Sequence, residues 1–250
     1  MAWTTDALIA NIKRRAAVPT AQNTYQNADF LDLIRDELFT YIVPMVCELR
    51  ENFYFYDVDF TIASYSGVYD IPTRAVGAKI VNMRLIAGDR EEDIDWIDDD
   101  SIDNVEGFPN GDIGAWIKRN QLITVPRTVT GWTTLRMSVL LRPGEPVLAS
   151  SADVITGISG SVVTGTTIPS TWSTSNTFEL IQANPHFDSL GIALSASAVS
   201  TGASGTVTLS TAPSSRLAVG DYIALNGQSP IVQAPEVCFP LLSLLFGHNY

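Results

Sequence analysis

The hydrophobic positions of the first fifty residues repeat at helical spacing. Leu8, Ile9 and Ile12 fall on one face, after a candidate N-cap at Thr4 or Thr5. A longer apolar stripe follows, with members three or four positions apart: Phe30, Ile34, Leu38, Ile42, Met45 and Leu49. The pattern predicts helices over 4–16 and 27–51, with Pro44 kinking or breaking the second after about four turns. The stripe fits either the chain's own core or packing between neighbouring copies.

After residue 52 the pattern changes to the alternation that is typical of strands. Aromatic and β-branched residues alternate with polar ones, and Gly, Pro and Asn interrupt them. Strands are expected over 52–62, 68–71, 78–87 and 134–141, and a hairpin over 115–118 and 121–125 that turns at Arg119-Asn120. Together they predict an antiparallel β-domain over residues 53–145.

An acidic loop over residues 91–112 interrupts this β-domain. It holds ten of the chain's 27 acidic residues, and apolar residues such as Ile94 and Trp96 anchor it. Asp93 and Asp95 match the first ligands of a calcium-binding loop, but Ile97 and Asp98 then break that pattern. The loop is therefore expected to be a solvated acidic surface, with an irregular cation site at Asp98, Asp99 and Asp100 as the minor alternative.

The composition shifts after Pro143. No lysine or arginine occurs over 143–215, where Ser, Thr, Gly, Ala and Val dominate, which predicts a second, all-β module over 146–232. Two stretches within it, 159–164 and 204–209, are similar enough to be a pseudo-repeat of a hairpin or a chance likeness. The final segment, 233–250, is apolar and is expected to be buried in its own domain or against a partner. Its candidate contact residues are Phe239, Leu242, Leu245 and Phe246.

These segments predict an α+β fold. N-terminal helices (residues 1–52) pack with the antiparallel β-domain, and the Ser/Thr/Gly-rich β module follows as a second domain. The candidate interface residues are the helical stripe positions Phe30, Ile34, Leu38 and Ile42, together with the acidic triplet and the apolar end.

Charge and cysteine content narrow the classes of function. The formal net charge is −12, with only 15 basic residues, which is not typical of a nucleic-acid-binding protein. An acidic surface suits either a wall past which DNA slides or plain solubility. No apolar run reaches the roughly 18 residues of a membrane span, and the N-terminus does not resemble a signal peptide, so a cytoplasmic origin is expected. Cys47 and Cys238 are expected to be buried free thiols.

The sequence offers no strong catalytic pattern. It contains no dinucleotide-binding, P-loop or nucleophile-elbow motif, and its two cysteines and two histidines are scattered singly. His186, Asp188 and Ser189 are too close in sequence to favour a catalytic triad. We therefore expect neither enzymatic activity nor a cofactor. A glycan-binding face built from tryptophans remains an alternative, with these candidates: Trp96, Trp116, Trp132 and Trp172.

Several short motifs occur in an order that resembles bacteriophage head-to-tail adaptor, or connector, proteins of the podovirus type. They are Tyr69-Asp70-Ile71-Pro72, Lys79-Ile80-Val81, the strand Leu135 to Pro143, Ala218 to Ile223, and the stretch Pro230 to Leu242. The resemblance covers most of the chain in order. It departs from that group at the end, because the helical region expected after Pro235 is short here.

The resemblance implies a structural virion protein of the neck, made in the host cytoplasm. Such proteins form a homo-oligomeric ring, typically of about twelve copies, below the portal. The ring extends the DNA channel, lets DNA pass without specific binding, and offers a docking surface for tail, nozzle or fibre proteins. Expected partners are therefore the portal, tail proteins and neighbouring copies, with no membrane. The alternatives are a phage tail or decoration β-protein that binds glycans and, less favoured, a hydrolase that acts on cell wall.

Overall fold

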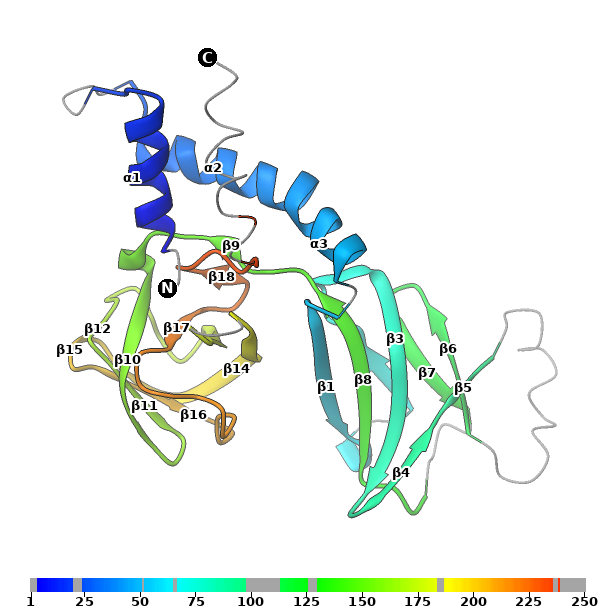
Figure 1. Cartoon of the computed structure of the whole chain (residues 1–250). Helices are drawn as coiled ribbons and strands as arrows, with labels where there is room; N and C mark the ends of the chain where they lie inside the picture. Colours follow the sequence, from blue (N-terminus) through cyan, green and yellow to red (C-terminus); the bar gives the residue numbers. More distant parts are fainter. Residues whose placement is uncertain are drawn as a thin grey trace. The chain divides into compact units, whose positions relative to one another are not determined.

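The structure, a computed structural model, describes residues 4–19, 24–50, 52–64, 67–97, 113–125, 130–183, 187–235 and 238, with the side chains of 78, 79 and 125 left aside. The chain separates into two compact units. Unit 1 comprises Met1–Glu51 and Pro143–Tyr250, and unit 2 comprises Asn52–Arg142 (Figure 1). The predicted α+β class is confirmed. The helical region and the second β module, which were expected as separate regions, belong to one unit.

The helices of unit 1 begin close to their predicted positions. Helix α1 spans Thr5–Arg15, and the side chain of Thr4 caps it by accepting a hydrogen bond from the amide of Ala7 at 3.2 Å. Helix α2 spans Asn27–Glu37, and the π-helix η1 (Leu38–Ile42) and helix α3 (Val43–Leu49) continue it directly.

Pro44 does not break the long helix, so of the two expected effects, a kink or a break, the break does not occur. The helix passes through a π turn just before the proline, where the amide of Val43 donates to the carbonyl of Leu38. The amide of Val43 bonds one residue farther back than in an α-helix, so the hydrogen-bond pattern changes directly before the proline, which itself has no amide to donate. The run from α2 to α3 is therefore continuous (Figure 1).

A closed six-stranded barrel forms the β part of unit 1. Its strands lie in the order β10-β11-β16-β14-β13-β17, and β17 closes on β10. Their bounds are β10 Ala152–Ser159, β11 Val162–Gly165, β13 Thr177–Ile181, β14 Ser189–Ser200, β16 Thr206–Leu209 and β17 Tyr222–Leu225. Shorter elements flank the barrel: β9 Glu145–Pro146, η5 Ala149–Ser151, β12 Thr167–Ile168, β15 Gly202–Ala203 and β18 Gln228–Ser229.

The two similar stretches of the second β module lie side by side. Strand β11 pairs antiparallel with β16, and Val163 lies opposite Val207 at the centre of the pair. Both valines are fully buried in the barrel core. The two valines are not equivalent in the likeness, because it aligns Val162 with Val207 and Val163 with Thr208, and Val162 and Thr208 are only half-buried. The similar stretches therefore form neighbouring strands without occupying equivalent positions in the core.

The N-terminal helices attach to the barrel's flanking segments. The amide of Thr5 donates to the carbonyl of Pro230 at 2.9 Å, and Thr4 forms a bridge with Ile231. A carboxylate oxygen of Asp6 accepts from the amide of Ala149 at 2.8 Å. The helices were expected to pack with the domain over 53–145, but they form one unit with the second β module instead.

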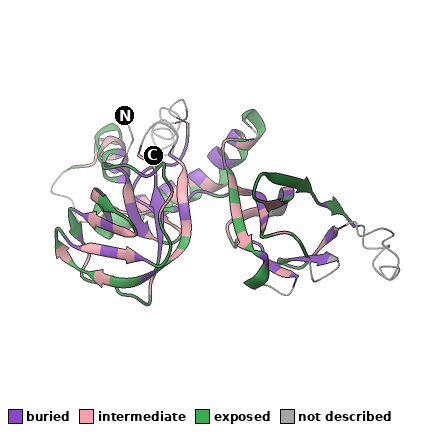
Figure 2. Cartoon of the chain, turned by 90° about the horizontal axis from the view of Figure 1, so that it is seen from below, coloured by how far each residue is buried: buried purple, intermediate pink, exposed green. Residues whose placement is uncertain are grey.

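Unit 2 consists of two four-stranded sheets around one core. The first has the order β1-β8-β3-β4 and the second the order β2-β7-β6-β5. Their bounds are β1 Phe55–Thr61, β2 Val68–Asp70, β3 Ala75–Ala87, β4 Arg90–Asp93, β5 Asp95–Trp96, β6 Gly114–Lys118, β7 Gln121–Val125 and β8 Thr134–Leu141, with the short helix η2 at Ile62–Ser64. Side chains from both sheets share one core, including Tyr69, Leu85, Leu122 and Leu135. Buried and exposed residues alternate along many strands (Figure 2).

The predicted hairpin of unit 2 is confirmed. Strands β6 and β7 pair antiparallel with Lys118 opposite Gln121, so Arg119 and Asn120 form the turn. Arg119 has a φ of 58°, the left-handed conformation that a tight hairpin turn requires.

Candidate functional site

An apolar groove lies between α1 and α2 in unit 1. Its cavity volume is about 310 Å³, and its lining includes Ile12, Ala16, Tyr25, Phe30 and Leu33. Tyr25 is 47% exposed and Leu33 is 37% exposed, so part of the lining faces solvent. Exposed apolar side chains that gather in a concave surface favour binding of another apolar surface.

Basic residues occupy the end of α1 beside this groove. Lys13 donates to the side-chain oxygen of Asn27 at 2.7 Å and lies 5.0 Å from the centroid of the Phe30 ring. Arg14 donates to the side-chain oxygen of Asn11, and Arg15 is exposed. Positive charge at a helix C-terminus also stabilises the helix itself. This rim of the groove is therefore basic in a chain that is acidic as a whole.

The long helix buries one face and exposes large apolar side chains on another. The predicted stripe residues Phe30, Ile34, Leu38 and Ile42 are all buried by the chain itself, at 0–6% exposure. This burial corresponds to the core-packing interpretation of the stripe; an additional role between copies stays a prediction.

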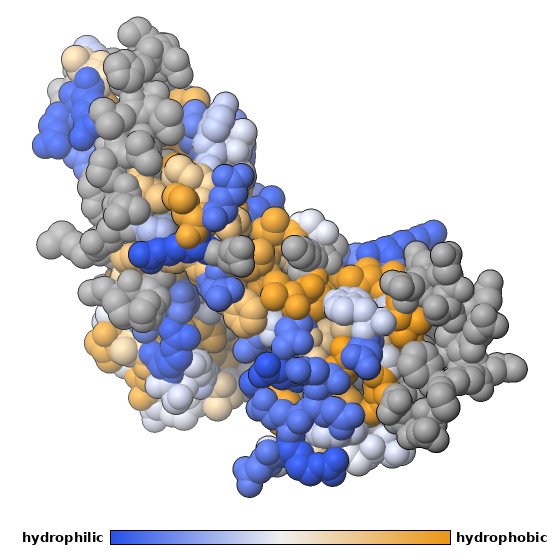
Figure 3. Space-filling view, turned by 45° about the vertical axis from the view of Figure 1, so that its right-hand side comes forward, coloured by the Kyte–Doolittle hydropathy of each residue, from blue (hydrophilic) through white to orange (hydrophobic). Residues whose placement is uncertain are grey.

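Two large side chains farther along the helix face solvent. Tyr41 is 61% exposed and Leu49 is 75% exposed. The sequence pattern did not single out Tyr41, and it placed Leu49 on the apolar stripe, for which core packing and contact between copies were both open. Hydrophobic side chains also reach the surface in several places on the face shown in Figure 3, among hydrophilic ones.

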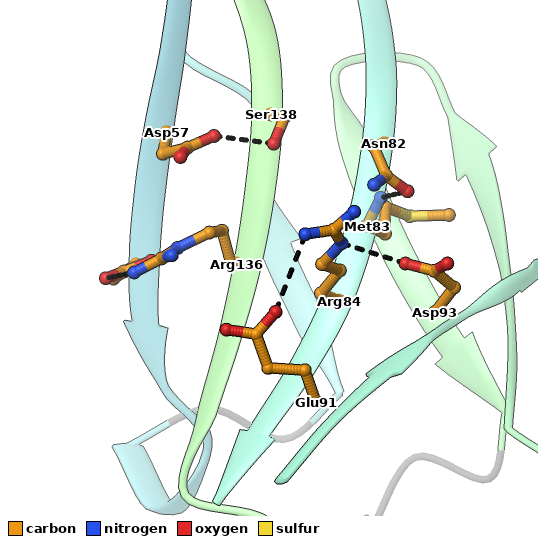
Figure 4. A network of polar contacts seen from close by, with 9 residues as sticks. Asp57, Asn82, Met83, Arg84, Glu91, Asp93, Arg136 and Ser138 are labelled. Carbon is orange, nitrogen blue, oxygen red and sulfur yellow. Dashed lines mark hydrogen bonds and ion pairs between the residues drawn. The ribbon is translucent and has the colours of Figure 1, made fainter. Parts of the chain in front are cut away.

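A ladder of charges crosses the outer face of the first sheet in unit 2 (Figure 4). Asp59, Arg136, Arg84 and Asp93 lie directly opposite one another on β1, β8, β3 and β4. Arg136 donates two hydrogen bonds to Asp59, at 2.7 and 2.8 Å. Arg84 donates to Asp93 at 2.9 Å and lies 3.5 Å from a carboxylate oxygen of Glu91.

This arrangement neutralises two arginines that stand side by side. The hydrogen bond to Asp59 raises the pKa of Arg136 further above its usual value, so the guanidinium stays charged. In the next rung, Ser138 donates to Asp57 at 2.6 Å. Because both guanidinium groups are engaged by carboxylates, neither is left to grip a phosphate, and the face stays acidic.

Charge reversal at Asp59 tests this ladder. Asp59→Lys places three cations, the new lysine with Arg136 and Arg84, side by side across the sheet. This change is expected to lower the free energy of unfolding by about 1 kcal/mol. The loss should shrink in 1 M salt, where the Debye length is about 3 Å. Urea denaturation at low and high salt measures it, with Glu92→Lys as the matched control, since exposed Glu92 lies opposite Leu85. Equal losses in the two variants would show that the ladder contributes nothing specific.

Buried carboxylates in the barrel hold loops in place. Asp153, Glu179 and Asp221 are 7%, 0% and 4% exposed. Both oxygens of each carboxylate accept hydrogen bonds: from the amides of Val154 and Thr167, from the Ser189 hydroxyl and the Gly227 amide, and from the amides of Ala183 and Ala218. Burial raises the pKa of Asp153, and its backbone hydrogen bonds oppose that shift. With backbone donors in these positions, the three acids serve the fold.

The described residues include neither an activated cysteine thiol nor a cluster of metal-binding side chains. Cys47 is half-buried and Cys238 buried, and both are free. Burial raises the pKa of both thiols, although Arg50 lowers that of Cys238, so burial favours their protonated forms.

Within the described ranges, no group of three or more His, Cys, Asp and Glu side chains is placed to hold a metal ion. No helix in the part of the chain that the structure describes is long and apolar enough to cross a membrane.

The tryptophan candidates do not share one face. Trp172 is 4% exposed inside the barrel, 5.2 Å from Phe178 between ring centroids. In unit 2, Arg90 covers Trp132 at 4.8 Å and Lys118 covers Trp116 at 5.6 Å, whereas Trp96 is 47% exposed. Three further groups of candidates lie outside the described residues: the acidic triplet Asp98, Asp99 and Asp100, the histidine His186, and the apolar-end residues Phe239, Leu242, Leu245 and Phe246.

No family model matches this chain, and no curated protein matches it significantly.

Proposed function

We propose that this protein is a structural subunit of a bacteriophage head-to-tail adaptor. In this role, neighbouring copies form a ring that joins the portal to the tail and extends the DNA channel. The ordered motifs support the proposal, and several of their described residues lie at positions that build the fold. Tyr69 on β2 and Leu135 on β8 are fully buried, and Ile223 on β17 belongs to the barrel core.

The single observation that carries an assembly role is the exposed apolar surface of unit 1. Tyr41 and Leu49 project from the long helix, and the groove between α1 and α2 is lined by exposed Tyr25 and Leu33. Large apolar side chains facing water cost free energy unless a partner covers them. A subunit that must contact neighbours in a ring has a reason to keep such surfaces.

The charge distribution is compatible with a channel wall. The net charge is −12, and the ladder of unit 2 has its arginines matched by carboxylates. DNA that passes such a surface is repelled rather than held, because retention requires basic residues that displace counterions. The proposal therefore includes DNA as a passing partner, and it places the protein in the neck of the virion.

Particle imaging of the protein with and without its portal tests the proposal. We expect mass photometry and negative-stain images of the purified chain mixed with a portal from the same source to show rings stacked on the portal. Rings that form mainly on the portal support the adaptor role. A chain that stays monomeric and leaves the portal bare contradicts it, and binding to a sugar array would then favour the glycan-binding alternative.

A further inference from the structure

The long helix of unit 1 carries two apolar surfaces that cannot cover each other within one chain. One is the groove between α1 and α2, which includes Leu33, and the other is the distal end of the helix, with Leu49. From Leu33 to Leu49 a helix rises about 24 Å at about 1.5 Å per residue. Since α2, η1 and α3 form one continuous run, that separation is fixed.

The two surfaces differ in shape in a way that lets one receive the other. The groove has a cavity volume of about 310 Å³ and an apolar lining. At the distal end, Tyr41 and Leu49 stand out from the helix, at 61% and 75% exposure. A protruding aromatic and aliphatic pair that enters an apolar pocket is the arrangement typical of interface anchors.

The charges beside the two surfaces are opposite. The consecutive residues Lys13, Arg14 and Arg15 lie at the end of α1 beside the groove. At the distal end Glu48 is exposed, and Glu37, one turn before Tyr41, is half-buried, with one carboxylate oxygen buried and without a hydrogen-bond partner among the described residues.

Charges of the other sign also occur at each surface. Asp29 lines the groove, but its carboxylate accepts from the amide of Gln26 at 2.7 Å. Arg35 is paired with Asp32 and Asp36, and Arg50 adds one positive charge at the distal end. The balance is therefore basic beside the groove and acidic at the distal end, which favours their mutual approach.

We infer that the groove between α1 and α2 binds the distal helix end, around Tyr41 and Leu49, of a second copy of this chain. The inference deepens the proposed ring, on which it rests. Because the contact joins two different surfaces, it can repeat from copy to copy head to tail, and such an assembly closes as a ring or continues as a filament. A two-fold dimer, in which each groove binds the helix end of the other copy, uses the same contact twice; wild-type particles of dimer mass that grow no further in mass photometry, alone and on the portal, would overturn the head-to-tail arrangement.

Photo-cross-linking tests the contact directly. A photoreactive phenylalanine analogue replaces Leu49 in the full-length chain, and this protein is mixed with ¹⁵N-labelled wild type, alone and on the portal. We expect cross-links between copies to reach residues 16–35, the tryptic peptide that contains Tyr25, Phe30 and Leu33. Cross-links that map elsewhere, or none in either sample, overturn the inference. If the analogue at Leu242 labels residues 16–35 instead, the apolar end occupies the groove and the inference fails.

Complementary variants test the direction of the contact. Leu49→Glu removes the distal anchor and Leu33→Glu disrupts the groove, so each is expected to weaken self-association at least about tenfold. A mixture of the two variants keeps one intact contact and should give dimers that grow no further in mass photometry. Val219→Glu is the control, since Val219 is 66% exposed in the barrel part of unit 1 and should assemble as wild type does.

The outcomes separate this inference from the proposed function. Cross-links to 16–35 without rings on the portal would keep the head-to-tail contact and remove the adaptor role. Rings on the portal that persist in Leu49→Glu and Leu33→Glu would keep the adaptor role and overturn the contact.

Discussion

Replacing Phe178 by alanine is expected to lower the free energy of unfolding of unit 1 by about 4 kcal/mol. Phe178 lies on β13, is fully buried, and packs edge-on against the ring of Trp172. Removing its ring deletes buried apolar surface and leaves a cavity in a closed barrel. Such a barrel collapses poorly, because its strands are hydrogen-bonded on both sides. A loss of this size is a large share of the stability of an ordinary domain.

Circular dichroism at 222 nm during urea denaturation measures this effect. In the described ranges, α1, α2, η1 and α3 all belong to unit 1. The hydrogen bond from Thr5 to Pro230 joins α1 to the segment that follows the barrel. The helical signal should therefore be lost with the barrel, at a lower urea concentration than in the wild type. Val219→Ala is the control, since that side chain is mostly exposed and should change stability by less than about 0.5 kcal/mol.

The unfolding midpoints of the two variants, followed by the helical signal, are compared with that of the wild type to test the prediction. If Phe178→Ala and Val219→Ala share the wild-type midpoint, Phe178 does not support the barrel core. If the midpoint shifts but the helices persist beyond the loss of the barrel, the helices do not depend on the barrel for their stability.

Gly205→Ala is expected to be the second most damaging change, with a loss of about 3 kcal/mol. A Cβ at this position would lie 2.3 Å from the carbonyl oxygen of Ser200 and 2.9 Å from that of Gly202. Both are backbone atoms, so no side chain can rotate away to relieve the clash. The carbonyl of Gly205 also accepts from the amide of Gly165, which links the crowded turn to β11.

Gly160→Ala is the matched control, because it changes the corresponding glycine in the other member of the similar pair. Gly160 has a φ of +59°, and nothing lies within 4 Å of where its Cβ would be. Alanine there costs only the left-handed backbone conformation, about 1 kcal/mol. Thermal unfolding followed by circular dichroism should show a clearly larger drop in Tm for Gly205→Ala. Equal drops would mean that the crowding at Gly205 is relieved by backbone movement.

The two glycines show how far the internal likeness of the second β module extends. Each follows a serine in a Ser-Gly turn, and the strands after them pair with each other. Yet in the first turn the glycine adopts the left-handed conformation, whereas in the second Ser204 does so, with a φ of 52°. Sequence similarity aligns the two glycines, but packing against neighbouring backbone decided what each glycine does.

In the long helix, too, the tertiary structure decided which apolar positions are buried. Its buried positions Phe30, Ile34, Leu38, Ile42 and Val46 recur every four residues, and Val43 is buried as well. An α-helix has 3.6 residues per turn, so a strict four-residue spacing drifts around it, and a wider turn is needed to keep one face buried. The π turn at Leu38–Ile42 supplies that correction and leaves Leu49 exposed. The sequence pattern placed Leu49 on the apolar stripe but left open whether that stripe packs in the core or against a neighbouring copy, and the exposure of Leu49 excludes the core for this one residue.

The candidate contact surface was only partly foreseeable. The stripe from Phe30 to Ile42 was recognised as apolar, but it is buried. The groove beside it depends on how α1 lies against α2. Tyr41 carried no signal in the sequence, because one apolar residue off the main stripe is common on helices.

Local patterns alone determined the element types, the α+β class and the hairpin turn at Arg119-Asn120. They did so because side-chain periodicity follows directly from the geometry of helices and strands. Only the tertiary structure decided that the N-terminal helices join the second β module, through contacts such as Asp6 with Ala149 and Thr5 with Pro230. Periodicity predicts that one face of a helix or strand is buried. Which element packs against that face depends on hydrogen bonds and packing between residues far apart in the chain.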